Sequence, residues 1–367
     1  MKKILCLIHL PPPAYGVTVL NKNIINGQLN KYFNLDTISI NTSRKLNEVE
    51  KLSLTKICVF FSIVSKLVRK LLLNRFCFCY FSLAPTGIAF YKDMIFVLLL
   101  RIFHVKRLYH LHGKGVSLKK DFLHKLLYKY CFNKSKVILV SQSLFYDIKD
   151  YIDKKNVFVL PNAIHNTLKD SEFEKIIKKR SFKERADLLF LSNITRNKGA
   201  FFALEAAQIL KNNGLNFKFY FVGEWKDVSS EEFFDKVEQC NLKNEVKYLG
   251  FKTGKDKSFI LEESDIFVYP TYNDIFGIVN LEAMEYGLPI ISTDEGAIPE
   301  IVEDNVTGFI IPKKNGPSLS KKIETLIRDK QLRIKMGTQG RKKFLANYTF
   351  DKFEENLIDI FNKEISN

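Results

Sequence analysis

The sequence predicts an α/β fold made of two parallel sheets, one in each half of the chain. Short apolar runs bounded by Gly, Pro and polar residues alternate with longer amphipathic segments, which is typical of parallel strands with helices on both faces. This alternation starts at Ile4–Leu10 and starts again at Asp187–Ser192. A length of 367 residues also suits two domains better than one core. We therefore expect two similar α/β domains in tandem.

Six strands are expected in the first half. The first, Ile4–Leu10, follows two lysines and precedes three prolines, but its apolar core is too short for a signal peptide and lacks a small-residue cleavage pattern. After the PPPAYG loop, a helix is expected from about Val17 to Asn30. The other strands are expected at Phe33–Ile40, Phe76–Ser82, Arg107–His112, Lys136–Ser141 and Asn156–Leu160.

A second series of six strands is expected after a charged segment. That segment, residues 166–186, is poor in apolar residues and is the predicted linker between domains 1–165 and 187–345. Residues 346–367 contain a final amphipathic helix. The strands are expected at Asp187–Ser192, Phe217–Val222, Val246–Leu249, Ile266–Pro270, Pro289–Ser292 and Gly308–Ile311.

The positive charge is confined to the first half. The chain has 57 basic and 40 acidic residues, but residues 1–155 alone hold 26 basic and 8 acidic ones. Such a domain attracts polyanions or an anionic membrane surface. The alternative is that its basic residues only form a solvated face. The longest apolar segment, Leu54–Leu73, is interrupted by three lysines and an arginine, so no run is long enough to span a membrane.

Metal chemistry is not expected from this sequence. The six cysteines form no CxxC pair and are expected to be reduced thiols in a cytosolic protein. No D-x-D triplet occurs, so a metal-chelated diphosphate is not indicated. A GxGxxG fingerprint is also missing after the first strand, which argues against a dinucleotide dehydrogenase.

The candidate site lies in the run YNDIFGIVNLEAMEYGLPIIST, from Tyr272 to Thr293. Asp274 falls in the loop after a strand, and Glu282 falls in the helix expected from about Gly277 to Tyr286. The backbone amides of Phe276, Gly277 and Ile278 are expected to be free at that helix start, where they favour a phosphate. Glu282 can accept hydrogen bonds from a sugar diol. The alternative is a solvated Glu282 and an Asp274 that only stabilises its loop.

This run resembles the acid-x7-acid signature of the retaining GT-B glycosyltransferases of the group-one class, family four. The resemblance continues through Asp294–Pro312 and through Asn193–Gly199. It implies a GT-B fold, in which two Rossmann-like domains face each other across a cleft and the C-terminal helix packs back on the first domain. It also implies a UDP- or GDP-linked sugar as donor substrate, with no cofactor and no metal.

The resemblance implies a role for each matching residue of the second domain. Glu282 would bind the ribose diol, Lys198 would neutralise the diphosphate, and Asp274 would contact the transferred sugar as a catalytic residue. Two departures stand out. Asp274 is one methylene shorter than the usual glutamate, and Asn193 replaces a usual arginine. Arg196 either supplies that missing charge or is an exposed loop arginine.

Two residues of the first domain also match the family. His112, at a strand end and directly before Gly113, resembles the active-site histidine that contacts the donor sugar. The alternative for His112 is a structural histidine. Gly16 matches one glycine of the loop that approaches the diphosphate, and Tyr15 takes the place of the other.

The function expected from this resemblance is retaining glycosyl transfer in bacterial surface polysaccharide synthesis, that is capsule, O-antigen or lipopolysaccharide. The acceptor is expected to be a saccharide or a polyprenyl-diphosphate-linked saccharide. The enzyme is expected to be cytoplasmic and peripheral on the anionic inner face of the plasma membrane. A GT-B-fold nucleotide-sugar epimerase is an alternative, because it shares the architecture and needs no acceptor. A basic nucleic-acid-binding protein is a remote alternative, because the basic residues are dispersed and no binding motif accompanies them.

Overall fold

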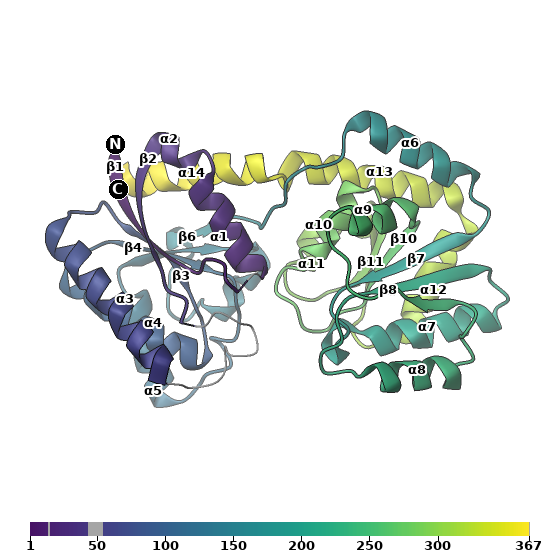
Figure 1. The fold of residues 1–367 in the computed structure, drawn as a ribbon, viewed down its shortest axis with the longest axis horizontal. Coiled ribbons are helices and arrows are strands. Elements are labelled where there is room, and N and C mark those ends of the chain that lie inside the picture. Colours follow the sequence, from purple (N-terminus) through teal and green to yellow (C-terminus); the bar gives the residue numbers. More distant parts are fainter. Residues whose placement is uncertain (14, 43–53, 367) are drawn as a thin grey trace. The chain divides into compact units, whose positions relative to one another are not determined.

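The computed structural model describes residues 1–13, 15–42 and 54–366, and divides into two compact units. The first unit contains Met1–Asn162 together with the end of the chain from Asp351 onwards. The second unit is Ala163–Phe350. Each unit is an α/β domain around its own parallel sheet, as the sequence predicts (Figure 1).

The sheet of the first unit has six parallel strands in the order β2-β1-β3-β4-β5-β6. Because β1 lies between β2 and β3, the chain first builds to one side and then to the other. The edge beyond the carboxyl ends of β1 and β3 is therefore a topological switch point, where ligands bind in open α/β sheets. The strands are β1 (Lys2–Ile8), β2 (Phe33–Ser39), β3 (Cys79–Leu83), β4 (Arg107–Leu111), β5 (Ser135–Leu139) and β6 (Val157–Val159).

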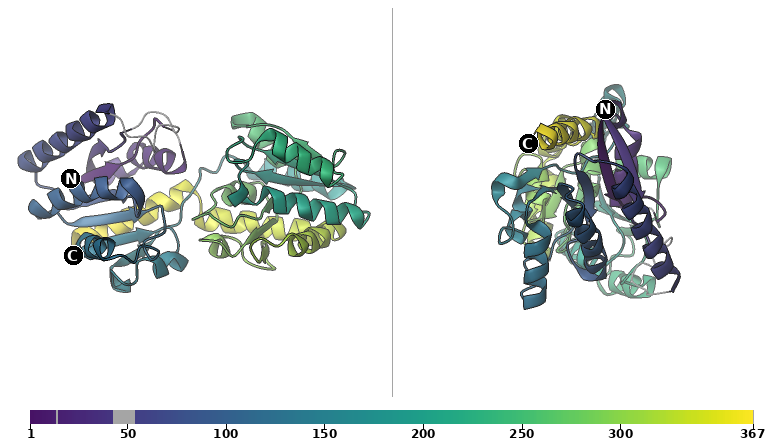
Figure 2. Two further views of the ribbon diagram at one scale, coloured as in Figure 1. Left: turned by 90° about the horizontal axis from the view of Figure 1, so that it is seen from below. Right: turned by 90° about the vertical axis from the view of Figure 1, so that its left-hand side faces the viewer.

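The helices of the first unit cover both faces of its sheet (Figure 2). Buried residues of α3, α4 and α5 pack on the face that carries Leu5, Phe81 and Tyr109. The last helix, α14, packs on the opposite face, where the Phe361 ring lies 5.1 Å from the Phe78 ring. The return of the C-terminal helix to the first domain is thus confirmed. The helices are α1 (Gly16–Asn26), α2 (Leu29–Tyr32), α3 (Leu54–Leu73), α4 (Gly87–Ile102), α5 (Phe122–Phe132) and α14 (Phe350–Ser366), with 3-10 helices at Gln142–Asp147 and Lys154–Asn156.

The sheet of the second unit has the order β12-β11-β10-β7-β8-β9, again all parallel. Its switch point lies between β7 and β10, as in dinucleotide-binding folds. The strands are β7 (Ala186–Leu191), β8 (Phe217–Val222), β9 (Val246–Tyr248), β10 (Ile266–Tyr269), β11 (Ile290–Thr293) and β12 (Gly308–Ile311). The helices are α6 (Asp170–Phe182), α7 (Ala200–Asn212), α8 (Ser230–Gln239), α9 (Gly254–Glu263), α10 (Val279–Glu285), α11 (Ile298–Ile301), α12 (Gly316–Arg328) and α13 (Lys330–Asn347), with the 3-10 helix η4 at Arg196–Lys198.

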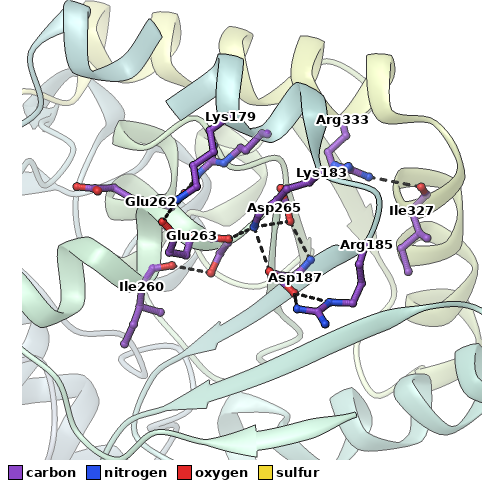
Figure 3. Close-up of polar contacts among 12 residues, drawn as sticks. Lys179, Lys183, Arg185, Asp187, Ile260, Glu262, Glu263, Asp265, Ile327 and Arg333 are labelled. Atoms are coloured by element: carbon purple, nitrogen blue, oxygen red, sulfur yellow. Dashed lines mark hydrogen bonds and ion pairs between the residues drawn. The ribbon is translucent and has the colours of Figure 1, made fainter. Parts of the chain in front are cut away.

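Residues 166–186, predicted to be a linker, are instead an integral part of the second unit. Most of them form α6, whose buried Arg180 donates to the carbonyls of Tyr286 at 2.7 Å and Leu261 at 2.8 Å. Lys183 lies 3.0 Å from Asp187 and 3.2 Å from the buried Asp265 (Figure 3). Arg180 and Lys183 therefore supply partners for buried carbonyls and carboxylates of the second unit. The sequence shows the polarity of the segment but not these partners, most of which lie far along the chain.

No helix among the described residues is long and apolar enough to cross a membrane.

Candidate active site

Three loops meet at the carboxyl edge of β7, β10 and β11, which are neighbours in the second sheet. We call residues 192–199, 270–277 and 294–297 the three site loops. The Tyr272 amide donates to the Asn197 carbonyl at 2.9 Å, and the Ala297 amide donates to the Ile275 carbonyl at 2.8 Å. The central loop is thus hydrogen-bonded to both of its neighbours. Residues distant in sequence are held together at the switch point of the sheet.

Lys198 is aimed at the central site loop by a short helical turn. The Thr195 hydroxyl caps η4 by accepting from the Lys198 amide at 3.2 Å. Gly199 follows with a φ of +82°, and a Cβ there would lie 2.2 Å from the Pro270 carbonyl oxygen. Only glycine fits at this position, and it lets the loop lie close against the end of β10. The Lys198 Nζ consequently reaches the Asp274 Oδ2 at 2.6 Å.

Asp274 is the centre of the polar contacts in the central loop. Its Oδ2 accepts from Lys198 and, at 2.5 Å, from the Tyr269 hydroxyl. Its Oδ1 accepts from the amides of Ile275 at 2.7 Å, Gly277 at 3.2 Å and Phe276 at 3.3 Å. Burial alone would raise the pKa of Asp274, but the Lys198 ammonium and these hydrogen bonds lower it below its ordinary value. The carboxylate is therefore ionised at neutral pH and fixed in orientation.

The prediction of free amides at the start of α10 is wrong for two of the three residues. The amides of Phe276 and Gly277 point at the Asp274 carboxylate, which occupies the place expected for an anion. An aspartate is short enough to fold back on the amides that follow it, as in Asx turns. The helix also begins at Val279, later than predicted, with Ile278 as its N-cap residue. The shorter acid noted in the sequence thus has a structural consequence, because it caps its own loop.

Gly277 is required by the backbone. Its φ is +72°, and a Cβ there would lie 2.6 Å from the Asn280 side-chain nitrogen. Gly296 has a φ of +55°, and a Cβ there would lie 2.5 Å from the Ile275 carbonyl oxygen. Both glycines therefore permit left-handed turns that bring the second and third site loops together.

Glu282 lies on α10 and is oriented by a lysine of the neighbouring helix α9. Its Oε1 lies 2.9 Å from the Lys257 Nζ, and its side chain is 19% exposed. An ionised carboxylate has about four acceptor positions, so one ammonium leaves capacity for a diol. The structure therefore places an oriented acceptor on the helix that follows the central site loop.

Arg196 is held away from Asp274 in this structure. Its guanidinium pairs with Glu232 at 2.5 Å, and its side chain is 53% exposed. The Arg196 amide donates to Asp227 at 3.0 Å. The structure therefore does not bring Arg196 to the Lys198–Asp274 pair, and its donor-binding role stays a prediction.

The predicted residues of the first unit lie at the carboxyl edge of its sheet. His112 directly follows β4, and its ring centroid lies 3.9 Å from that of His110, which is buried beside the Tyr80 hydroxyl. Burial and nearby His9 lower the pKa of His112 to about 4, although Asn162 opposes the shift. Gly16 begins α1, and a Cβ there would meet no atom within 4 Å. Packing thus does not require glycine at this position.

The comparisons with known proteins fit this site. Residues 171–343, which hold all three site loops, match the family described as "Glycosyl transferases group 1". This region, which lies within the second unit, therefore belongs to the group 1 glycosyl transferases. A curated relative is the capsular polysaccharide biosynthesis glycosyltransferase CapM of Staphylococcus aureus, 24% identical over 268 residues that span 70% of each protein. Alignments with the curated relatives span between 34% and 70% of those proteins.

Solved structures support the GT-B architecture of this glycosyl transferase. HepE of Anabaena, crystallised with UDP, matches 99% of the chain and 100% of its own with a TM-score of 0.75 at 16% identity. WaaG, a glycosyltransferase involved in lipopolysaccharide biosynthesis, matches 98% of the chain and 99% of its own with a TM-score of 0.66 at 17% identity. At such low identity the likeness shows the fold alone.

Three residues of the glycosyl transferase site were missed by the sequence reasoning. Tyr269 ends β10 and donates to Asp274, but in the sequence it is indistinguishable from any other aromatic residue of a strand. Glu295, beside Gly296 in the third site loop, accepts from the Asp274 amide at 3.4 Å and pairs with Lys313 at 2.5 Å. Lys257 sits in a charged helix with nothing in its surroundings to mark it. Only Glu295 had a signal, because it belongs to a family-like run.

The buried histidines make the stability of this glycosyl transferase sensitive to acid. An unfolded histidine binds a proton near pH 6.5, whereas His9 and His112 remain neutral down to about pH 4 in the folded chain. As the pH falls through this range the unfolded state gains protons first, so stability that is complete above pH 6.5 is lost toward pH 4. We expect the melting temperature of His112→Gln to fall less than that of the unmodified protein between about pH 7 and about pH 4.5.

The comparison of the two proteins removes the contribution of other groups. Burial raises the pKa of Asp93 to about 6, which acts in the opposite direction over part of the same range but equally in both proteins. If the melting temperatures of the two proteins fell in parallel with pH, His112 would be protonated without a cost in stability, and the prediction would be contradicted.

Proposed function

We propose that this enzyme transfers a glycosyl group, with retention of anomeric configuration, from a nucleotide-diphosphate sugar to a saccharide or lipid-linked saccharide. The observation that carries the proposal is the Lys198–Asp274–Tyr269 cluster at the switch point of the second sheet, with Glu282 on the following helix. Ligands of open α/β sheets bind at this edge. The HepE structures with UDP and with UDP-glucose support a UDP-linked donor, and GDP is the alternative base.

The cluster suggests how the donor is held. The Lys198 ammonium lies 2.6 Å from Asp274, and a bound diphosphate would compete with that carboxylate for the ammonium. Glu282, oriented by Lys257, would accept from the two ribose hydroxyls. Asp274 would contact the transferred sugar from the central loop. The diphosphate in the middle of the donor would thus be bound by charge, and the ribose and the transferred sugar on either side of it by hydrogen-bond acceptance.

The proposed reaction follows a front-face path. As the bond from the sugar to the diphosphate breaks, negative charge develops on the leaving phosphate oxygen, and a fixed ammonium there lowers the barrier. That oxygen takes the proton of the attacking acceptor hydroxyl on the same face, so the transfer needs no separate base. We propose that Lys198 provides this charge stabilisation without a metal ion.

The acceptor and the site of action are inferred from relatives and from charge. CapM is named for capsular polysaccharide biosynthesis, and we propose the same general class of product, a surface polysaccharide. The net positive charge of residues 1–155 supports work at an anionic membrane surface, with the enzyme peripheral on the cytoplasmic face. A polyprenyl-diphosphate-linked saccharide would present its sugar at that surface.

The proposal is tested by following donor and product separately. Ligand-induced melting shifts with UDP- and GDP-linked sugars identify the donor, because a bound ligand stabilises the folded state by mass action. Release of the nucleoside diphosphate only in the presence of acceptor supports transfer, and the anomeric NMR signal of the product tests retention. Conversion of the nucleotide sugar with no acceptor present would favour the epimerase instead.

Glu282→Ala is expected to abolish the donor-induced melting shift, because the ribose loses its acceptor. A hydrogen bond between the nucleotide sugar and a charged side chain contributes about 1.5 to 3 kcal/mol. Its loss corresponds to a binding affinity that is weaker by roughly ten- to a hundredfold. The measurement is thermal melting with and without the nucleotide sugar.

Glu245→Ala is the matched control for this variant. Glu245 has the same 19% exposure and also pairs with one lysine, Lys211 at 3.1 Å, but it lies away from the site loops. Its variant should keep the full shift. An unchanged shift in Glu282→Ala would exclude the ribose assignment.

A further inference from the structure

The outward face of α4 carries no charged side chain. The exposed side chains of this helix include Tyr91 and four aliphatic residues, with exposures of 64% at Ile88, 42% at Tyr91, 41% at Ile95, 46% at Leu98 and 58% at Ile102. Their spacing of three and four residues places them in one stripe. The opposite side of α4 is buried in the core of the first unit, so the helix is apolar on both sides. A helix face that meets only water is normally polar, which makes this stripe unusual.

The apolar stripe of α4 continues onto α5. Phe122 is 83% exposed, Leu123 53% and Leu126 54%, and Leu118 just before the helix is 80% exposed. The two helices are joined at this surface, because the Tyr91 hydroxyl lies 3.0 Å from the His124 Nε2. We call the nine side chains of both stripes the apolar face: Ile88, Tyr91, Ile95, Leu98, Ile102, Leu118, Phe122, Leu123 and Leu126.

The second unit provides an internal comparison for the apolar face. It has the same architecture, yet its described residues include five exposed large apolar side chains, which belong to separate elements. In the first unit, by contrast, α4 and the region of α5 alone hold nine. The concentration is therefore a feature of the first unit, in which α3 adds six exposed large apolar side chains, and is not a property of the fold. The five are Phe182, Phe234, Phe251, Phe259 and Val306.

Lysines are interleaved with the apolar residues of α5 and of the segment just before it. Their side chains are exposed between and beside Phe122 and Leu126, in the domain that carries the excess positive charge of the chain. Leucine and phenylalanine beside lysine on one helix face is the composition of helices that lie in the interface of anionic membranes. The lysines are Lys119, Lys120, Lys125 and Lys129.

We propose that the apolar face inserts into the headgroup region of an anionic bilayer while the four lysines in and just before α5 contact its phosphates. The inference rests on the proposed function, and it deepens it by naming the surface and the mode of contact. The sequence alone indicates membrane contact only through the excess positive charge of residues 1–155. The structure adds an apolar contribution and assigns it to α4 and α5.

A second copy of the chain is a poorer occupant of this face. Two such faces brought together would place the lysines of one domain against the lysines of the other, in domains that each carry an excess of positive charge. Like charges so placed repel, whereas an anionic bilayer is complementary to both the lysines and the apolar side chains.

The test uses the purified full chain and sucrose-loaded vesicles of phosphatidylglycerol and phosphatidylcholine. The double variant Phe122→Ser and Leu126→Ser removes apolar surface and leaves the charge unchanged. We expect its partitioning to vesicles in a sedimentation assay to fall at least about tenfold. The matched control is Phe182→Ser and Phe234→Ser, whose residues are 74% and 48% exposed in the second unit, and it should bind as the unmodified protein does.

Salt separates insertion from charge attraction. Binding of the unmodified protein should persist in part at high salt, whereas the residual binding of the double variant should vanish, because only its screened electrostatic component remains. Unreduced sedimentation of the double variant would overturn the proposal. So would loss of a dimer in gel filtration without lipid, since the face would then be an interface between copies.

Failure of this inference is distinguishable from failure of the proposed function. The double variant should keep the melting temperature and the donor-induced melting shift of the unmodified protein, because its residues are exposed and belong to the first unit. A protein that binds donor but ignores vesicles would refute the membrane surface alone. A protein that binds vesicles but no nucleotide sugar would refute the proposed function alone.

Discussion

Lys198→Met is expected to lower kcat/KM by roughly a hundred- to a thousandfold, the loss that follows removal of one fixed donor to a developing anion. The physical reason is that the ammonium lies 2.6 Å from Asp274, at the edge where the leaving diphosphate would sit. The variant also leaves the Asp274 carboxylate without its cation, so we expect the free energy of unfolding to fall by about 1 to 3 kcal/mol. Steady-state kinetics and thermal melting measure the two effects.

Lys183→Met separates the loss of an ion pair from the loss of catalysis. Lys183 is 19% exposed and pairs with Asp187 and Asp265, much as Lys198, at 24%, pairs with Asp274. It lies at the opposite end of the strands, near the start of β7. Its variant should lose stability but keep kcat/KM per folded molecule. Equal kinetic losses in the two variants would indicate that Lys198 acts through stability only.

The strands of this enzyme were predictable because they are short, apolar and sharply bounded. Each of the twelve predicted strands overlaps an observed one, and Phe217–Val222 and Gly308–Ile311 agree at both ends. The errors are at the termini. β1 ends at Ile8, and the His9 carbonyl turns to accept from Asn21 at 3.0 Å, a contact with a later helix that no local pattern reveals.

The linker and the apolar face show where sequence patterns mislead. Polarity in residues 166–186 suggested solvent, but Arg180 and Lys183 contact groups about 80 to 107 positions later. Apolarity in residues 87–102 does not tell which side of a helix is buried, and one stripe of α4 is exposed. Both cases have one cause, since burial depends on neighbours that are distant in the chain.

The candidate site was predicted as residue types and not as contacts. Asp274, Glu282 and Lys198 were identified because they belong to sequence segments that resemble the family. Their partners were not, since Lys198 and Asp274 are 76 positions apart and Lys257 and Glu282 are 25 apart. Asp274 itself was expected beside free amides, whereas its own carboxylate accepts from those of Phe276 and Gly277. Only the structure separates its two functions, capping the loop and holding Lys198.

Asp274→Ala is expected to have the largest combined effect on stability and activity. It removes the acceptor of three backbone amides and the partners of Lys198 and the Tyr269 hydroxyl. Loss of a cap costs about 1 kcal/mol, and each buried group left unpaired adds about 1 to 3 kcal/mol, so we expect the free energy of unfolding to fall by roughly 2 to 5 kcal/mol. Activity should become undetectable, because the loop that carries the sugar contact loses its shape. Denaturant unfolding and a transfer assay measure these losses.

Two further substitutions separate the functions of Asp274. Asp274→Asn keeps an oxygen for the amides but loses the charge that pairs with Lys198, so it should be less destabilised than the alanine variant while losing most of its activity. Asp274→Glu carries the acid usual in the family but is one methylene too long to cap its own amides in the same way. It should be less stable and yet more active than the alanine variant. If the alanine variant instead melted like the unmodified protein, the three amides and Lys198 would have to find other partners, and the carboxylate would not be the centre of this loop.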